Sequence, residues 1–202
     1  MKLFYSNFSP CTRKVLITAH ITGHIKNIEI VDFMKSGSFK PSEDYHKSNP
    51  LLKIPALQIT PDNTIIDSPI ICEYLNSISH KDKIYPTDQA HYFFQRKIES
   101  IADGATDATV LRRYESLRPT NLFSIDYDKS QKLKIENSLN YLESITDQLT
   151  NLHYIGELSV MCLLSYLDMR FPHEDWRISR PKLSNWYDEC QNWEPFRATV
   201  IG

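Results

Sequence analysis

The sequence predicts an α/β amino-terminal domain followed by an all-α domain. Strand-like apolar runs and helical stretches alternate over residues 1–80 in the order βαβαββα. Beyond them the strand-like runs disappear, and helical periodicity continues over residues 88–202. Between the two parts, Lys81-Asp82-Lys83 and Pro86 mark a polar linker. With 202 residues, the chain is long enough for two small domains.

Charge, hydropathy and cysteine usage limit the classes of function. The chain has 23 Lys and Arg against 25 Asp and Glu, so no basic field indicates nucleic acid or an anionic membrane as a partner. No signal peptide is evident, and no apolar run approaches the roughly 18 residues of a membrane span. We expect a cytoplasmic protein with no metal and no disulfide, because the cysteines are far apart and lack metal-ligand spacing: Cys11, Cys72, Cys162 and Cys190.

The first strand, Lys2–Tyr5, leads directly into a helix. Ser9 is predicted to cap this helix, with Pro10 at the first helical position, where its missing N–H is not needed. The helix is expected to turn Arg13 and Lys14 toward water. A helix N-terminus favours an anion, including a thiolate. The alternative is that Ser9-Pro10 is a cap without further function.

A second strand is predicted over Asn27–Val31, parallel to the first because a helix connects the two. A loop follows over Met34–Pro41. It contains Lys35 and Lys40, each of which is either solvated or reaches a ligand carboxylate. One or two helical turns are then predicted over Ser42–Lys47.

A hairpin follows, and its first strand, Leu51–Ile59, has a proline near its start. Because Pro55 cannot donate to a strand ladder, it must lie at a strand start or edge, and the Ile54-Pro55 bond is a candidate for the cis isomer. The residues next to Pro55 would then have backbone N–H and C=O groups that no neighbouring strand pairs with. Thr60-Pro61-Asp62-Asn63 is typical of a turn, after which Thr64–Ile66 should return antiparallel.

The first domain is predicted to close with a second Ser-Pro helix start, in which Ser68 caps and Pro69 takes the first helical position. In the second domain, Ile155–Phe171 is apolar throughout and should form the buried centre. Leu133 is expected to face the interior. Three further helices are predicted around this centre: His91–Arg118, Asp128–Thr150 and Pro181–Gln191.

Three motifs carry a resemblance to a known family. They are Tyr-Ser-x-x-Ser-Pro-x-x-Arg-Lys at 5–14, Asn-Pro-x-x-Lys-Ile-Pro-Ala-Leu at 49–57 and Asp-Ser-Pro-Ile-Ile-x-Glu-Tyr-Leu at 67–75. In this order they resemble the amino-terminal half of bacterial cytosolic glutathione S-transferases with a serine-type active site. The second half agrees through residues 96–99, 102–104 and 166–168. The resemblance implies a thioredoxin-like domain followed by an all-helical one.

The resemblance also implies roles for residues that match the motifs. Ser9 would be the catalytic hydroxyl that stabilises the glutathione thiolate. Glutathione would be bound as co-substrate by Lys53, Ile54, Pro55, Asp67 and Ser68. The Ile54 backbone, before a cis proline, would pair with the cysteinyl part, Asp67 and Ser68 would hold the γ-glutamyl end, and Lys53 would lie near the glycyl end.

The implied activity is transfer of an alkyl or aryl group in detoxification, by attack of the thiolate on a hydrophobic electrophile. The electrophile site is expected between the domains, near Asn7-Phe8 and the inner face of the first long helix, at Asp107, Val110, Leu111 and Tyr114. A homodimer is also implied, formed by the second hairpin and helix of the first domain against the first long helix of the partner. The aromatic run Tyr92, Phe93 and Phe94 favours such an interface.

Two alternatives stay open. Cys11 either fills a helix turn or, with a lowered pKa in the first turn, forms a mixed disulfide with glutathione, which would make the protein a thiol reductase. The second alternative is a non-catalytic protein of the same fold that binds RNA polymerase, as proteins resembling the stringent starvation protein do. Fold does not decide between these. The set Ser9, Pro55, Asp67 and Ser68 favours the enzyme, because a binding module has no physical reason to keep it.

Overall fold

The computed structural model describes residues 1–32, 45–46, 49–149 and 152–201. It divides into two units, residues 1–85 with 194–202, and residues 86–193. The segment from residue 194 onward, which we expected in the helical domain, therefore joins the first unit. Lys35 and Lys40 lie outside the described residues, as do the predicted helical turns at 42–47 apart from residues 45 and 46.

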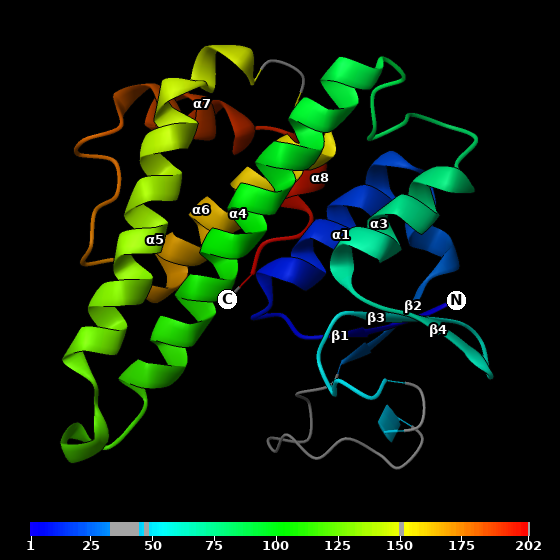
Figure 1. Cartoon of the computed structure of the whole chain (residues 1–202). Coiled ribbons are helices and arrows are strands. Elements are labelled where there is room, and N and C mark those ends of the chain that lie inside the picture. The colour runs from blue at the N-terminus through cyan, green and yellow to red at the C-terminus, as the bar shows by residue number, and fades with distance from the viewer. Residues whose placement is uncertain (33–44, 47–48, 150–151, 202) are drawn as a thin grey trace. The chain divides into compact units, whose positions relative to one another are not determined.

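The first unit is built on a four-stranded mixed sheet with the strand order β2-β1-β3-β4 (Figure 1). β1 pairs with β2 in parallel, and β3 pairs antiparallel with both β1 and β4. This is the βαβ unit followed by a hairpin that the sequence predicts, and it confirms the thioredoxin-like domain. The strands are β1 (Lys2–Tyr5), β2 (Glu29–Asp32), β3 (Ala56–Thr60) and β4 (Asn63–Ile65).

Two helices, α1 (Pro10–Ile21) and α3 (Ser68–Ser77), pack together on one face of this sheet (Figure 1). A short 3₁₀ helix, η1 (Ile25–Asn27), connects α1 to β2. Burial of branched apolar side chains between the two layers stabilises the unit, at about 1.5–3 kcal/mol for each. The fully buried side chains include Leu3, Val15, Ile17, Leu57, Ile71 and Leu75.

The prediction that Arg13 and Lys14 face water is wrong, because their exposed fractions are 3% and 1%. The final helix, α8 (Glu194–Arg197), packs on α1 and covers this face. The Arg13 guanidinium donates to the Phe196 carbonyl oxygen at 2.8 Å and lies 3.7 Å from the centre of the Phe196 ring. A charged group is tolerated here because a hydrogen bond and a cation–π contact replace its hydration.

The second unit is helical, as predicted, with α6 (Ile155–Arg170) at its centre. Every α6 residue from Ile155 to Leu167 is buried. α4 approaches α6 so closely that a Cβ on Gly156 would lie 2.7 Å from the Gln95 carbonyl oxygen. The remaining helices are α4 (Gln89–Ser116), η2 (Thr120–Leu122), α5 (Ile125–Ser144), η3 (Thr146–Gln148) and α7 (Pro181–Cys190).

α5 differs from the prediction at both ends. Ser124 caps it by accepting from the Tyr127 N–H at 3.3 Å, so the helix begins before Asp128. It ends at Ser144, where the chain tightens into η3. Leu133, which we expected inside, is 61% exposed, because the buried α5 positions are those of Gln131, Ile135, Leu139 and Leu142.

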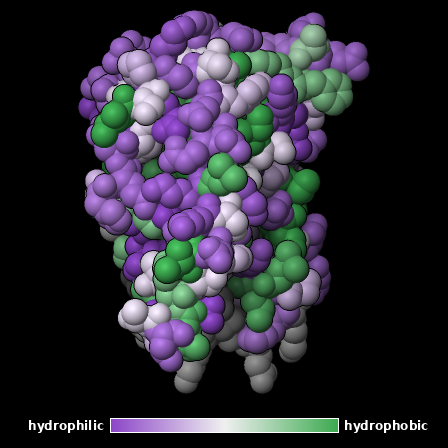
Figure 2. Space-filling model, turned by 60° about the vertical axis from the view of Figure 1, so that its left-hand side comes forward, coloured by the Kyte–Doolittle hydropathy of each residue, from purple (hydrophilic) through white to green (hydrophobic). Residues whose placement is uncertain are grey.

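No helix of the described residues is both long enough and apolar enough to cross a membrane. The face shown in Figure 2 agrees with this, since hydrophilic side chains dominate it and hydrophobic ones are interspersed.

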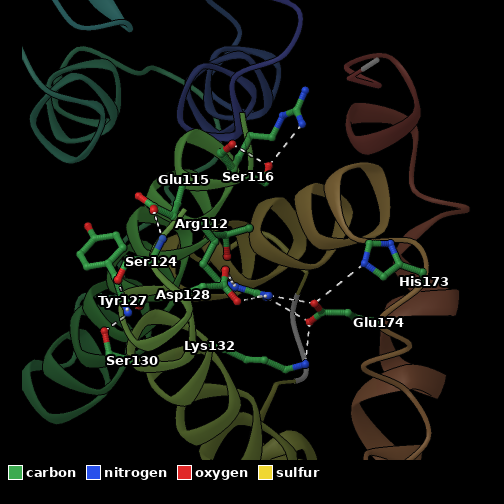
Figure 3. Close-up of polar contacts among 12 residues, drawn as sticks. Arg112, Glu115, Ser116, Ser124, Tyr127, Asp128, Ser130, Lys132, His173 and Glu174 are labelled. Atoms are coloured by element: carbon green, nitrogen blue, oxygen red, sulfur yellow. Dashed lines mark hydrogen bonds and ion pairs between the residues drawn. The ribbon is translucent and has the colours of Figure 1, made fainter. Parts of the chain in front are cut away.

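A charged cluster ties α4 and α5 to the segment after α6 (Figure 3). Arg112, 4% exposed, donates to both carboxylate oxygens of Asp128 at 2.9 and 3.1 Å, and to both of Glu174 at 3.0 and 2.8 Å. Lys132 adds an ion pair with Glu174 at 3.0 Å. Hydrogen bonds from Arg112, above all, hold the pKa of Glu174 down at about 2, although burial opposes this.

Because of this cluster, we expect the protein to lose stability in acid. The pKa of Glu174 is lowered from 4.5 to about 2 on folding, so its contribution is complete above pH 4.5 and is lost as the pH falls toward 2. Thermal unfolding at neutral pH and at about pH 3 should therefore show a smaller fall in Tm for Glu174→Gln than for the wild type. The exposed Glu189→Gln serves as control and should behave as the wild type does. An equal fall in all three proteins would contradict this role of Glu174.

Candidate functional site

Strand register brings the predicted site segments to one end of the sheet. Phe4 is paired with Ala56, so the carboxyl end of β1 lies beside the amino end of β3. Leu57 is paired with Ile65, so β4 also ends there. The residues that follow β1 and β4 and those that precede β3 therefore meet at the same edge. Ser9, Ile54 and Asp67 all belong to these segments.

Ser9 caps α1, as predicted. Its Oγ accepts from the Thr12 N–H at 3.2 Å, and its carbonyl oxygen accepts from the Arg13 N–H at 3.0 Å. The residue is partly exposed. Among the described residues no acceptor takes the hydroxyl proton, so this proton remains available to a ligand. The site therefore combines one hydroxyl donor with the positive end of a helix.

The turn before Ser9 is held by its own side chains. The Tyr5 hydroxyl donates to Asn7 Oδ1 at 2.7 Å, and Ser6 Oγ accepts from the Phe8 N–H at 3.3 Å. Burial, assisted by the nearby charge of Asp32, raises the pKa of Tyr5, so the phenol stays protonated and remains a donor. Tyr5 thus orients the loop and does not itself point a charge at the site.

The prediction that Ser68 caps the second helix is wrong by one residue. The N-cap of α3 is Asp67, and Ser68 is the first helical residue. The Asp67 carbonyl oxygen accepts from the Ile71 N–H at 2.9 Å, whereas the exposed Asp67 carboxylate makes no capping bond. No loop or capping bond of the described residues uses the N–H groups of Ser68 and Ile70. The start of α3 therefore presents one acceptor, the Asp67 carboxylate, and two donors, the N–H groups of Ser68 and Ile70.

The segment before β3 places Ile54 and Pro55 at the same edge. The Ile54–Pro55 peptide bond is cis, in agreement with the sequence prediction, and Pro55 is buried. No turn or loop hydrogen bond in the described part of the chain uses the Ile54 backbone. Lys53 is exposed, so its ammonium faces solvent. The edge thus presents a backbone unit that is outside the strand ladder and can pair with an extended ligand.

Two residues that the sequence analysis missed support this segment. The Tyr45 hydroxyl donates to the Lys53 carbonyl oxygen, and Asn49 Nδ2 donates to the same oxygen at 2.6 Å. The exposed fraction of both Tyr45 and Asn49 is 1%. The motif contained Asn49 beside Pro50, but no sequence signal identified Tyr45.

The cysteines separate into one partly exposed thiol and three buried ones. Cys11 lies in the first turn of α1 and is partly exposed. Cys72, Cys162 and Cys190 are buried, and none of these four described cysteines forms a disulfide. Burial, with the nearby charge of Glu157, raises the pKa of Cys190, which makes that thiol unreactive. Cys11 is therefore the thiol best placed to react.

The residues expected to contact the electrophile lie along one stripe of α4. Leu111 and Tyr114 are 41% and 66% exposed, Asp107 is exposed, and Val110 is partly exposed. The opposite side of α4, including Ala105, Ala108 and Thr109, is buried. α4 therefore carries an uncovered stripe that is largely apolar.

A cavity in the helical unit is a second candidate for the functional site. It has a volume of about 250 Å³ and is lined by Arg112, Lys132, Leu139, Phe171, Glu174 and Trp176, among others. Its basic groups Arg112 and Lys132 are both paired with Glu174, in the cluster of Figure 3. Among the described residues, no His, Cys, Asp and Glu side chains gather in threes as a metal site would require. The end of the sheet where β1 and β4 finish and β3 begins is the better candidate site.

Comparison with known proteins relates this chain to one family. The family model described as the glutathione S-transferase amino-terminal domain matches residues 8–78, which include Ser9, Ile54 and Asp67. An Escherichia coli K12 protein, described as the uncharacterized GST-like protein YibF, is 30% identical over 202 residues, with 98% of each chain covered.

Solved structures of glutathione transferases are similar to this chain over its full length. A glutathione transferase family member from Pseudomonas fluorescens Pf-5, with bound glutathione, is 31% identical with a TM-score of 0.91 over 100% of this chain and 98% of its own. A glutathione S-transferase from Methylobacillus flagellatus KT, with glutathione bound, is 30% identical with a TM-score of 0.90 over 100% and 99% of the two chains. From these likenesses, which span both units, it follows that the chain belongs to the glutathione S-transferase family.

Proposed function

We propose that this protein binds glutathione at the sheet edge and activates its thiol for attack on a hydrophobic electrophile. The observation that carries the proposal is the convergence of Ser9, Ile54 and Asp67 at one end of the sheet. Support comes from the relatives that span both units and hold glutathione in their structures.

Each part of the tripeptide finds complementary chemistry there. The γ-glutamyl carboxylate would accept from the first N–H groups of α3, beside Ser68, and its ammonium would pair with the exposed Asp67 carboxylate. The cysteinyl backbone would pair with Ile54 ahead of Pro55. The exposed Lys53 is suited to the glycyl carboxylate. In this arrangement the thiol would lie toward Ser9.

The energies available are adequate for activation. Lowering a thiol pKa from about 8.5 to about 6.5 needs roughly 2.7 kcal/mol of preference for the thiolate. A hydrogen bond from the Ser9 hydroxyl to a charged acceptor would supply about 1.5–3 kcal/mol, and the α1 N-terminus about 0.3–2 kcal/mol. The thiolate then forms a carbon–sulfur bond as the leaving group departs from the electrophile. No general base is needed, because the thiol proton is released to solvent water when glutathione binds as the thiolate.

A reaction that uses a free thiol tripeptide also suits the reducing, cytoplasmic compartment that the free cysteines favour.

The first prediction separates Ser9 from Cys11. The two side chains are two residues apart and point about 200° apart around the helix axis, so they cannot both meet one sulfur atom. Ser9→Ala should raise the pKa of bound glutathione, followed by thiolate absorbance, by about 1–2 units. Cys11→Ala should leave the titration unchanged.

Two results would contradict this assignment. If Ser9→Ala leaves the pKa of bound glutathione unchanged and Cys11→Ala abolishes turnover, the protein would instead be a thiol reductase that works through a mixed disulfide. Failure of the wild-type protein to bind glutathione in calorimetry at roughly millimolar concentration would favour the non-catalytic binding protein.

We further propose a homodimer in which α4 contributes to the interface. Phe93 is 61% exposed and its ring contacts Tyr92 edge-on, at 5.3 Å between centroids. Light scattering should give twice the chain mass of 23.6 kDa, and Phe93→Glu should shift the protein toward monomer, because a charge would be buried at the interface. Leu133→Glu, at an equally exposed position on α5, is the control and should stay dimeric. A monomeric wild type would contradict the proposal.

A further inference from the structure

The segment before Pro55 is held by an interlocked set of hydrogen bonds. Tyr45 and Asn49 both donate to the Lys53 carbonyl oxygen, and Asn49 Nδ2 also donates to the Tyr45 hydroxyl oxygen at 3.2 Å. Asn49 Oδ1 accepts from the Leu51 N–H at 3.0 Å, so every polar atom of the Asn49 amide has a partner. We call Tyr45, Asn49 and the Lys53 carbonyl the carbonyl clamp.

The clamp is anchored in the sheet. The Tyr45 ring packs edge-on against Phe4 of β1, with 4.7 Å between the ring centroids. The exposed fraction of Tyr45 is 1%, and burial raises the pKa of its phenol, which keeps the proton available for donation. The Lys53 carbonyl is thereby fixed relative to β1, the strand that leads to Ser9.

Rigidity of the peptide bond carries this restraint to Ile54. The Lys53–Ile54 bond is not among the cis bonds of the chain, so it is trans, with the Lys53 C=O and the Ile54 N–H pointing in opposite directions in one plane. Fixing the carbonyl oxygen therefore fixes the direction of the Ile54 N–H. The loop needs such support, because Leu52 has a φ of +55°, which leucine adopts rarely.

We propose that Tyr45 and Asn49 are positioning residues for glutathione, because the carbonyl clamp aims the Ile54 N–H at the cysteinyl part of the tripeptide. This inference rests on the proposed function. Preorganisation of this kind raises affinity, since the bound orientation of the backbone need not be ordered when the ligand arrives. Neither residue touches the ligand in this account, so both act only through Lys53 and Ile54.

The test measures the Kd of glutathione by calorimetry, with Tm recorded for every variant. Tyr45→Phe keeps the ring on Phe4 and removes one donor to the carbonyl, and it should raise Kd by about three- to tenfold. Asn49→Ala removes the other donor and should raise Kd at least as much. The double variant should raise Kd by less than the product of the two single effects, because Asn49 also donates to the Tyr45 hydroxyl and each single change therefore weakens both contacts.

The matched control is Asn76→Ala. Asn76 Oδ1 accepts from the Ile84 N–H at 2.9 Å, so this change removes an amide from the same unit without altering the clamp. It should lower Tm and leave Kd unchanged. The inference is overturned if wild type binds and both clamp variants keep Kd within about twofold, or if Asn76→Ala raises Kd as much as they do. Absence of binding in the wild type would instead remove the proposed function, and the inference with it.

Discussion

The register of three strands is the constraint on which the rest of the site depends. Because β1 and β4 end where β3 begins, the helices that follow β1 and β4 both start at the same edge of the sheet. The N-termini of α1 and α3 therefore lie there together with the cis Ile54–Pro55 bond. A slip of one residue in this pairing would turn the side chains of the strand to the opposite face and displace these groups.

The electrostatic character of the edge follows from that placement. Two helix N-termini bring partial positive charge and N–H donors, which suits the two anionic groups of a tripeptide thiolate, its sulfur and its γ-glutamyl carboxylate. In the proposed function, the Asp67 carboxylate at the start of α3 would hold the ammonium. In the proposed mechanism the protein would orient the tripeptide and stabilise its charges, while the reactive sulfur belongs to the ligand.

Local signals allowed much of this to be predicted, whereas local ambiguity and contacts between distant parts of the chain account for the errors. Ser9-Pro10 and the turn before β4 act within a few residues, so the helix start and the hairpin were predictable. Asp67 and Ser68 are both residue types that cap helices, which is why the sequence alone placed the cap one residue late. The burial of Arg13 depends on Phe196, 183 residues away. The bond from Tyr45 to the Lys53 carbonyl has no sequence signature at all.

We propose above all that Ser9 holds the thiol of glutathione at this end of the sheet. A crystal structure of the protein with glutathione tests it most directly. We expect the sulfur within about 3.5 Å of Ser9 Oγ, with the cysteinyl backbone paired to Ile54 and the γ-glutamyl group at the start of α3. A sulfur bonded to Cys11, or a tripeptide bound away from the ends of β1 and β4, would contradict it.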